Sequence, residues 1–232
     1  MKNLGKSRCE SCIIRHLNSF KALNKEELIK ISSIKEIKSF KKGEVIFGEG
    51  KRLKGIYCIK SGNPKLSKMS DNGKNHIVKI ASRGDLLGQR SLISESPSNL
   101  SAVALNDMEV CFVPKDHIID LTENKSFIKE VLVNMTNELK IANDNIVEMA
   151  QKKVNQRIAK ALLYLEENFG FDAEGYLILV LSREDFSNVV GAAKEAFIRT
   201  LSEFKKNKLI SLSGKKIKIL DKEKLQQIAS FS

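Results

Sequence analysis

Residues 181–212 constrain the fold of this chain most, because their pattern indicates two helices joined by a tight turn. Ser182 is placed to cap the first helix, and Glu184 and Asp185 follow near the positive end of the helix dipole. Gly191 falls where a two-helix corner needs a backbone without a Cβ atom. The segment is therefore predicted to form a helix-turn-helix.

The second predicted helix, about residues 194–206, turns Phe197 and Leu201 toward the protein interior. Four side chains are left facing outward: Lys194, Glu195, Ile198 and Arg199. Side chains near the start of such a helix can reach base edges in a major groove. The pattern therefore predicts DNA binding, and the alternative is an ordinary helix pair with a solvated charged face.

The residues after this motif favour DNA binding. Residues 209–210 and 216–219, with a turn at Ser213 and Gly214, predict two short strands that form a wing. Residues 183–232 hold 11 Lys or Arg against 6 Asp or Glu, a net charge of +5. The whole chain carries +12, with a pI of about 9.5. A basic balance of this size favours a polyanionic partner.

Composition and motifs exclude several other classes. No apolar run approaches 18 residues and the first 12 residues lack an apolar core, so neither a membrane span nor a signal peptide is predicted. We expect a cytoplasmic protein whose four cysteines are thiols or ligands. The absence of Trp argues against a single-strand binder that stacks bases. The sequence has no Gly-rich phosphate loop, no metal-binding His pair and no Ser/His/Asp set, so nothing in it indicates an enzyme.

Residues from about 20 to 118 carry short β-like runs separated by Gly turns at intervals near ten residues. This spacing predicts an antiparallel barrel or sandwich. The runs occupy residues 44–47, 55–59, 76–80, 102–105 and 110–113. Pro64 either weakens the strand after Gly62 or marks an edge or bulge.

From about residue 125 the pattern becomes helical, with apolar residues stepping alternately by four and three. They are Ile128, Leu132, Met135, Leu139, Ala142, Ile146 and Met149. This heptad seam predicts a parallel homodimer helix, and the alternative is a helix laid on its own β domain. A second helix at about 156–169 and a strand at 176–180 are predicted to lead into the helix-turn-helix.

In this order, the parts resemble the CRP/FNR family of bacterial transcription regulators. The resemblance is carried by these segments: KGEVIF at 42–47, EG at 49–50, IYCI at 56–59, SG at 61–62, GDLLG at 84–88, LSRED at 181–185, then Gly191, Glu195, Arg199 and residues 215–217. It implies an α+β chain with a Cys-containing segment (1–19), a jelly-roll-like antiparallel β-roll (20–124), a dimerisation helix (125–152) and a winged helix-turn-helix (153–232).

The resemblance also implies roles on DNA. Glu195 and Arg199 match the family's base-reading pair, which suits cytosine N4 and guanine O6 and N7. Lys194 stands where some members make another base or phosphate contact, and Ile198, which replaces a small or polar residue, could touch a thymine methyl group. The expected phosphate partners are Ser182, Arg183, Lys205, Lys206 and Lys215. A homodimer would place two recognition helices about 34 Å apart on double-stranded DNA. RNA polymerase is a further expected partner.

The loop that holds cyclic AMP in some members is altered here. Those members use a Glu for the ribose and an Arg-Ser pair for the phosphate, whereas Gln89 and Leu100 stand at the Glu and Arg positions. Arg90 could compensate, one residue along. An effector pocket, if the β-roll has one, would be formed by Gly88, Gln89, Arg90, Ser91, Leu100 and Ser101. The substitutions argue against cyclic AMP.

The cysteines leave the signal open. Cys9 and Cys12 form a C-x-x-C pair, and Cys111 aligns with the distal cluster ligand of oxygen-sensing members. Asn18 replaces their third N-terminal cysteine, and Cys58 could substitute for it, although we expect its strand to turn it toward the core. An iron–sulfur cluster usually needs four thiolates; His16 would suit only an unusual site.

The alternatives that remain are a cluster or other metal that responds to oxygen or nitric oxide, a thiol redox pair, an unidentified ligand, or no ligand at all. Cys58 and Cys111 could equally be small buried apolar residues. The isolated His76 and His117 are expected to be packing or surface residues. A different function is a ligand-binding β-roll whose basic tail contacts a protein or membrane, and a weak salt dependence of DNA affinity would favour it.

Overall fold

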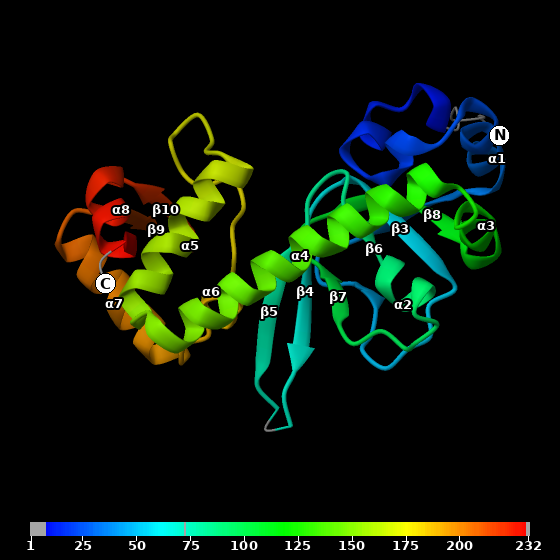
Figure 1. Ribbon diagram of the computed structural model, residues 1–232. Helices are drawn as coiled ribbons and strands as arrows, with labels where there is room; N and C mark the ends of the chain where they lie inside the picture. The colour runs from blue at the N-terminus through cyan, green and yellow to red at the C-terminus, as the bar shows by residue number, and fades with distance from the viewer. Residues whose placement is uncertain (1–7, 72, 231–232) are drawn as a thin grey trace. The chain divides into compact units, whose positions relative to one another are not determined.

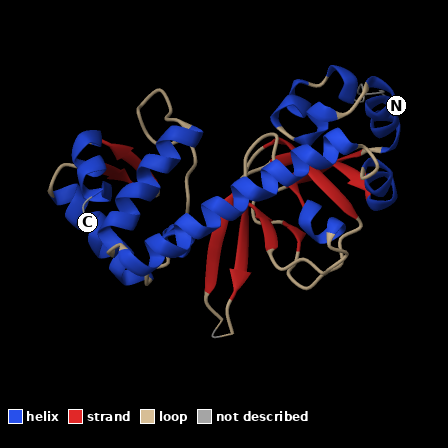
Figure 2. Cartoon of the chain, viewed as in Figure 1, coloured by secondary structure: helices blue, strands red, loops and turns tan. Residues whose placement is uncertain are grey.

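The computed structural model describes residues 8–71 and 73–230. The chain divides into two compact units, Met1–Leu139 and Lys140–Ser232. The first holds two antiparallel sheets with helices, and the second is mostly helical with one two-stranded sheet (Figures 1 and 2). The predicted α+β fold with a β-roll, a long helix and a winged helix-turn-helix is confirmed. Among the described residues, no helix is both long and apolar enough to cross a bilayer.

Short helical turns open the described chain. They are η1 (Cys9–Ser11), η2 (Ile13–Leu17) and η3 (Ser19–Ala22), followed by α1 (Lys25–Ile34). A capping box starts α1: Asn24 Oδ1 accepts from the Glu27 N–H at 2.9 Å, and Glu27 accepts from the Asn24 N–H at 2.8 Å. Turns of three to five residues carry no periodicity, and for this reason the sequence did not predict them.

The β-roll consists of two four-stranded sheets. One has the order β1 (Glu36–Phe40), β8 (Met108–Pro114), β3 (Gly55–Ser61) and β6 (Leu86–Leu87). The other has the order β2 (Val45–Phe47), β7 (Ser101–Ala104), β4 (Pro64–Met69) and β5 (Asn75–Ile80). The five predicted strands are present, and Pro64 begins β4, an interior strand rather than an edge. The first strand residue is a position where a missing N–H is tolerated.

The two faces of the β3–β8 pair contribute to different cores. Ile59 and Val110 point between the two sheets, where they are fully buried. Cys58 and Cys111 lie on the opposite face, in a core that includes Phe20 and other residues of η1–η3, α1 and α4. Strand alternation produces this division. Cys58 is buried as expected, but it faces the covering helical segment rather than the space between the sheets.

Two short helices, α2 (Gln89–Ile93) and α3 (Lys115–Leu121), precede the long helix α4 (Lys125–Gln151). Phe127 and Val131 of α4 are buried against the first unit, and Ile128 and Met135 of the heptad seam pack partly on the same core. Three other seam residues are more than half exposed: Leu132 (58%), Leu139 (62%) and Ile146 (67%). Part of the seam therefore packs on its own domain, while Leu132, Leu139 and Ile146 stay exposed.

The second unit contains α5 (Val154–Phe169), α6 (Arg183–Val190), α7 (Lys194–Lys206), the antiparallel strands β9 (Ile210–Ser213) and β10 (Lys216–Ile219), and α8 (Lys222–Ser230). Its most buried side chains include Ile158, Leu162, Phe197, Leu201, Ile210 and Leu225. The strand predicted at 176–180 is wrong: Leu177 forms only an isolated bridge with Phe171. Alternate burial of Leu177, Leu179 and Leu181 produced a strand-like pattern, although no continuous ladder of backbone hydrogen bonds forms there.

Candidate nucleic-acid interface and thiol-lined cavity

The corner between α6 and α7 is fixed by local backbone chemistry. Ser182 Oγ accepts from the Asp185 N–H at 2.9 Å and caps α6, as predicted. Gly191 ends α6 with φ +59°, in the left-handed region that disfavours side chains. The Arg157 guanidinium donates to the Gly191 carbonyl at 3.3 Å. The sharp turn is therefore held both by its own sequence and by α5.

Packing beneath the corner sets which face of α7 is outward. Phe186 and Phe197 lie with ring centroids 4.9 Å apart, and Phe197 and Leu201 are buried, as predicted. Lys194, Glu195 and Arg199 are exposed on the opposite face, and Ile198 is 44% exposed. All four predicted base-reading side chains thus share one accessible face at the start of α7.

The predicted phosphate partners fall into two groups. Lys205, Lys206 and Lys215 are exposed. Ser182 is occupied by its cap, and Arg183 Nη2 donates to the Gly214 carbonyl in the wing turn at 2.8 Å. Burial lowers the pKa of Arg183. Arg183 therefore positions the wing against α6, a structural duty that the sequence did not indicate.

The altered β-roll loop begins α2. Gly88 caps this helix with φ +87°, and Gln89 follows at its first position. Arg90 pairs with Glu138 of α4 at 3.6 Å, and Lys79 contacts the same carboxylate at 3.1 Å. Burial lowers the pKa of Lys79, but Asp85 and Glu138 outweigh it and hold the value above normal. Arg90 is thus engaged with α4.

The remaining loop residues are also used within the fold. Leu100 packs against the core between the sheets, Ser91 is buried, and Ser101 Oγ accepts from the Glu49 N–H at 2.9 Å. The carboxylate and the cation that would hold a ribose and a cyclic phosphate are replaced by Gln89 and Leu100. Neither Gln89 nor Leu100 carries a charge, so these two positions cannot supply the cation that a buried cyclic phosphate needs.

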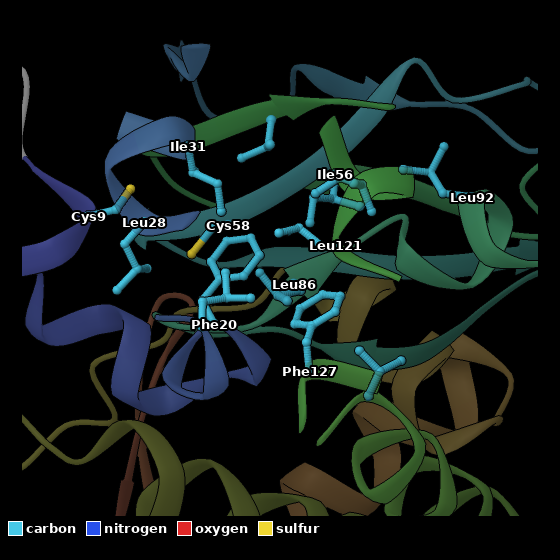
Figure 3. Close-up of a cluster of buried hydrophobic side chains, with 14 of the residues drawn as sticks. Cys9, Phe20, Leu28, Ile31, Ile56, Cys58, Leu86, Leu92, Leu121 and Phe127 are labelled. Carbon is cyan, nitrogen blue, oxygen red and sulfur yellow. The ribbon is translucent and has the colours of Figure 1, made fainter. Parts of the chain in front are cut away.

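All four cysteines line one small cavity of about 30 Å³, room for a few water molecules. Its walls come from η1, η2 and η3, from the end of α1, and from β3 and β8. The lining residues are Cys9, Cys12, Ile14, Arg15, Phe20, Ile31, Lys35, Cys58, Lys60, Cys111 and Val113. Figure 3 shows Cys9 and Cys58 with Phe20 and Ile31 in the surrounding apolar cluster. The fold thus gathers four thiols that lie up to about a hundred positions apart in sequence.

Cys58 and Cys111 occupy directly opposite positions of the antiparallel β3–β8 pair, so their side chains share a face. Burial raises the pKa of Cys58 to about 12 and raises that of Cys111 as well. Both are therefore protonated thiols near neutral pH when no metal is bound. Among the described residues, all four cysteines are free of disulfides.

Three cationic residues lie at the same cavity as the thiols. The buried Lys35 ammonium contacts Cys9 Sγ at 3.1 Å. Arg15 lines the cavity with its Nε buried and without a hydrogen-bond partner. Lys60 also lines the cavity and pairs with Glu109 at 3.0 Å. The sequence analysis missed all three, because positions 15, 35 and 60 form no motif with the cysteines.

The cavity suits an anionic group better than a neutral one. A buried N–H without an acceptor costs free energy, and charged or polar donors aimed at sulfur stabilise thiolates and bound sulfide. Over residues 8–71 and 73–230, no three Cys, His, Asp or Glu side chains converge closely enough to ligate one ion. Thiolates on an iron–sulfur cluster each bind a different iron, which requires wider spacing than a single ion does. Four cysteines at one cavity are the type of donor set that holds such clusters, although the cavity of about 30 Å³ is too small for one as it stands.

Comparisons with known proteins identify the families to which both parts of the chain are similar. Residues 37–125 match the family described as Cyclic nucleotide-binding domain, and residues 156–228 match Crp-like helix-turn-helix domain. The Fumarate and nitrate reduction regulatory protein of Yersinia pestis is 31% identical over 227 residues, 95% of this chain and 90% of that protein. Transcriptional activator protein anr of Pseudomonas aeruginosa is 28% identical over 234 residues, 99% and 95%.

The fold is also that of a solved structure, FixK2 from Bradyrhizobium japonicum. The TM-score is 0.76 at 22% identity, over 86% of this chain and 99% of that one. At this identity the likeness shows the fold alone.

Proposed function

Because this chain belongs to the CRP/FNR family of DNA-binding transcription regulators, we propose that it reads a two-fold symmetric operator as a homodimer. Each protomer inserts α7 into a major groove of one half-site. The accessible face of α7, with Glu195 and Arg199 one helical turn apart, is the observation that carries this proposal. Symmetry of the protein then dictates symmetry of the operator.

Base reading falls to four side chains of that face. Arg199 donates to guanine, Glu195 accepts from cytosine N4, and Ile198 contacts a thymine methyl group. Lys194 adds a base or phosphate contact. Lys205, Lys206 and Lys215 bind phosphate and set the position of the domain without specifying sequence.

The proposed dimer contact is the open part of α4. Leu132, Leu139 and Ile146 lie at heptad spacing and are each more than half exposed in the single chain. Pairing two such stripes removes apolar surface from water on both copies. Ile128 and Met135 lie at the margin of this contact because they already pack on the first unit, and Ala142 and Met149 extend it.

The setting follows from the family. A regulator of bacterial transcription works in the cytoplasm, where the DNA lies, and contacts RNA polymerase when it activates. We propose no catalytic role. Cyclic AMP is not the proposed signal, since Gln89 and Leu100 replace the residues that would bind it.

We propose that the thiol-lined cavity is the sensing site and that it holds an iron–sulfur cluster. Its cysteine thiolates supply ligands, while Lys35 and Arg15 offset their negative charge. Such a cluster, when bound, supplies reactivity toward oxygen or nitric oxide. Loading requires Cys9 and Cys12 to shift relative to the β3–β8 wall, since the cavity is only about 30 Å³.

The segment that must shift is attached to α4. Phe20, which lines the cavity, stacks on Phe127 with ring centroids 6.1 Å apart. Next to it, Asn134 of α4 donates to Ser19 Oγ at 2.9 Å, and Lys21 pairs with Glu130 at 2.9 Å. Occupation of the cavity therefore bears directly on the helix that carries the dimer seam.

The DNA-binding proposal is tested with operator and random duplexes over a range of salt concentrations. We expect the operator to bind at least about a thousandfold more tightly, with log affinity falling by roughly 0.9 per log salt for each phosphate neutralised. Leu139→Glu should sediment as a monomer and lose operator affinity, whereas Asn137→Glu, exposed on the same helix but off the seam, should remain dimeric. Weak binding with little salt dependence would instead favour a module with a protein- or membrane-binding tail.

The sensing proposal is tested by anaerobic purification, an absorption spectrum, and iron and acid-labile sulfide assays. We expect a brown protein with stoichiometric iron and sulfide that bleaches in air. An iron-free protein whose thiols still change DNA binding on oxidation would replace the cluster with thiol redox chemistry, which the contact between Lys35 and Cys9 would then serve.

A further inference from the structure

We propose that Cys58 is the fourth ligand of this site, so that the cluster is held by Cys9, Cys12, Cys58 and Cys111. The inference rests on the proposed function, in which the cavity holds a cluster. It assigns a ligand from a β-strand where oxygen-sensing relatives use a third cysteine of the N-terminal segment. Asn18 occupies that third position here.

The place of the missing ligand and the sulfur of Cys58 adjoin one another. Asn18 is buried, and its Nδ2 donates to Cys58 Sγ at 3.5 Å and to the Gly84 carbonyl at 2.9 Å. Its Oδ1 accepts from the Phe20 N–H at 2.9 Å and caps η3. Asn18 thus orders the turn. The Cys58 thiol of β3 lies beside the position at which relatives have their third N-terminal cysteine.

Cys58 and Cys111 together form a rigid half of the site. They face each other across β3 and β8, interior strands of one sheet, and β1 and β6 flank that pair. Cys9 and Cys12 form the other half, on and just after the turn η1, where the Cys12 N–H donates to the Cys9 carbonyl at 3.2 Å. Two thiols on the sheet and two on the short turn that covers it can together ligate a cluster that neither pair could hold alone.

Cationic and polar donors lie at the same cavity as Cys58. A four-iron cluster with four cysteine ligands carries two negative charges, and Lys35 and Arg15 are among the cationic residues that line the cavity. The Asn18 N–H adds a neutral donor at the sulfur of Cys58. Hydrogen bonds of this kind orient sulfur ligands and tune the metal they bind.

Ligand exchange gives a balanced route to the loaded protein. Metal-free chain is mixed anaerobically with a synthetic four-iron, four-sulfide cluster that carries four 2-mercaptoethanol thiolates. Each cysteine S–H replaces one small thiolate: an iron–sulfur bond to the protein forms, one to the small thiolate breaks, and the cysteine proton leaves on free 2-mercaptoethanol. No electron is transferred, and the charge of the cluster is unchanged.

After gel filtration, the iron, sulfide and 2-mercaptoethanol retained per chain are measured, together with the absorption spectrum. We expect about four irons and no retained 2-mercaptoethanol for the wild type. Cys58→Ser, close in shape and still able to accept from Asn18, should either lose the cluster or hold it through three cysteines and retain about one 2-mercaptoethanol per four irons. Ile59→Val, on the opposite face of the same strand, should load as the wild type does.

The double variant Asn18→Cys with Cys58→Ser moves the thiol to the neighbouring position and should again hold four irons with no retained 2-mercaptoethanol. If Cys58→Ser loads four irons and retains no 2-mercaptoethanol, Cys58 is not a ligand. The same holds if the double variant keeps its far-UV circular dichroism but behaves as Cys58→Ser does in loading, because Cys58 then acts through packing. A wild-type protein that takes up no cluster would overturn the proposed cluster site itself. This outcome differs from the failure of Cys58 as a ligand, in which the wild type still loads.

Discussion

The two units of this chain use their cations in opposite ways. In the second unit, Lys194, Arg199 and Lys206 point outward from α7 over an apolar core. In the first unit, Lys35 is buried in contact with Cys9 Sγ, and Arg15, whose Nε is buried, lines the same cavity. Outward cations suit a long polyanion that is met from solvent. Cations that line a small cavity suit a discrete anion instead.

This contrast shows why net charge is an incomplete guide to function. The basic balance of +12 correctly indicated a polyanionic partner, since many cations are exposed. The same count includes Lys35 and Arg15, which line the cavity with the four thiols. Four predictions, in order of decreasing effect, separate these roles.

The first prediction compares the buried face of α7, which stabilises the fold, with its exposed face, which is proposed to contact DNA. Phe197→Ala should destabilise the second unit by about 3–5 kcal/mol, because it empties a fully buried site against Phe186. Ile198→Ala, one position along and exposed, should change stability by no more than about 0.5 kcal/mol. Urea unfolding followed by far-UV circular dichroism measures both. Equal losses would mean that α7 does not have one buried and one free face.

The second separates base reading from positioning among the outward cations. Arg199→Ala should cost operator binding about 1–3 kcal/mol while binding to random DNA stays nearly unchanged. Lys206→Ala should weaken both duplexes alike and lower the salt slope by about 1. Fluorescence anisotropy with the two duplexes measures these effects. If Arg199→Ala weakens operator and random DNA equally, its base-reading role is wrong.

The third concerns the buried thiol wall of the first unit. The pKa of Cys58 is raised from 9.0 to about 12, so the unfolded chain loses this proton at a lower pH than the folded chain does. Stability is therefore retained below pH 9 and lost as pH rises toward 12. Between pH 8 and 10 the metal-free wild type should lose about 1 kcal/mol more than Cys58→Ala. Urea unfolding at each pH measures the free energy of unfolding of the two proteins. If this free energy changes with pH in the same way for both, Cys58 ionises as easily in the folded chain as in the unfolded chain.

The fourth concerns charges at the surface of the first unit. Glu138→Gln removes the ion pairs of α4 with Lys79 and Arg90, and should cost up to about 1 kcal/mol, since both pairs are partly solvated. The pKa of Lys79 should fall as one of its two carboxylate partners is lost. Glu123→Gln, exposed just before α4, is the matched control in thermal unfolding. A decrease of several kcal/mol in the free energy of unfolding would contradict this prediction, because it would mean that the ion pairs of Glu138 are not partly solvated.

Much of the second unit could be predicted because its signals are local. The cap of Ser182, the left-handed turn of Gly191 and the 3.6-residue spacing of Phe197 and Leu201 each depend on a few neighbouring residues. The bounds of α7 match the predicted 194–206 for this reason. The strand expected at 176–180 failed because strand formation needs a partner, and partnership is not a local property.

The candidate site of the first unit shows the opposite case. The sequence indicated Cys9, Cys12 and Cys111 as a set through a family resemblance, and left Cys58 as a doubtful substitute. The alternation of β3 determined which face Cys58 occupies, but only the covering by η1–η3 and α1 made that face a cavity. Lys35 and Arg15 had no motif to mark them, because their relation to the thiols exists only in space.

The sequence by itself determined the bounds of α7, the turn before it and the side chains that its first turns expose, since caps, turns and helical periodicity act over a few residues. The tertiary structure decided which cations are buried and which thiols meet, because long-range packing brings residues 9, 35, 58 and 111 together. It also decided how much of the α4 seam remains open to a second copy.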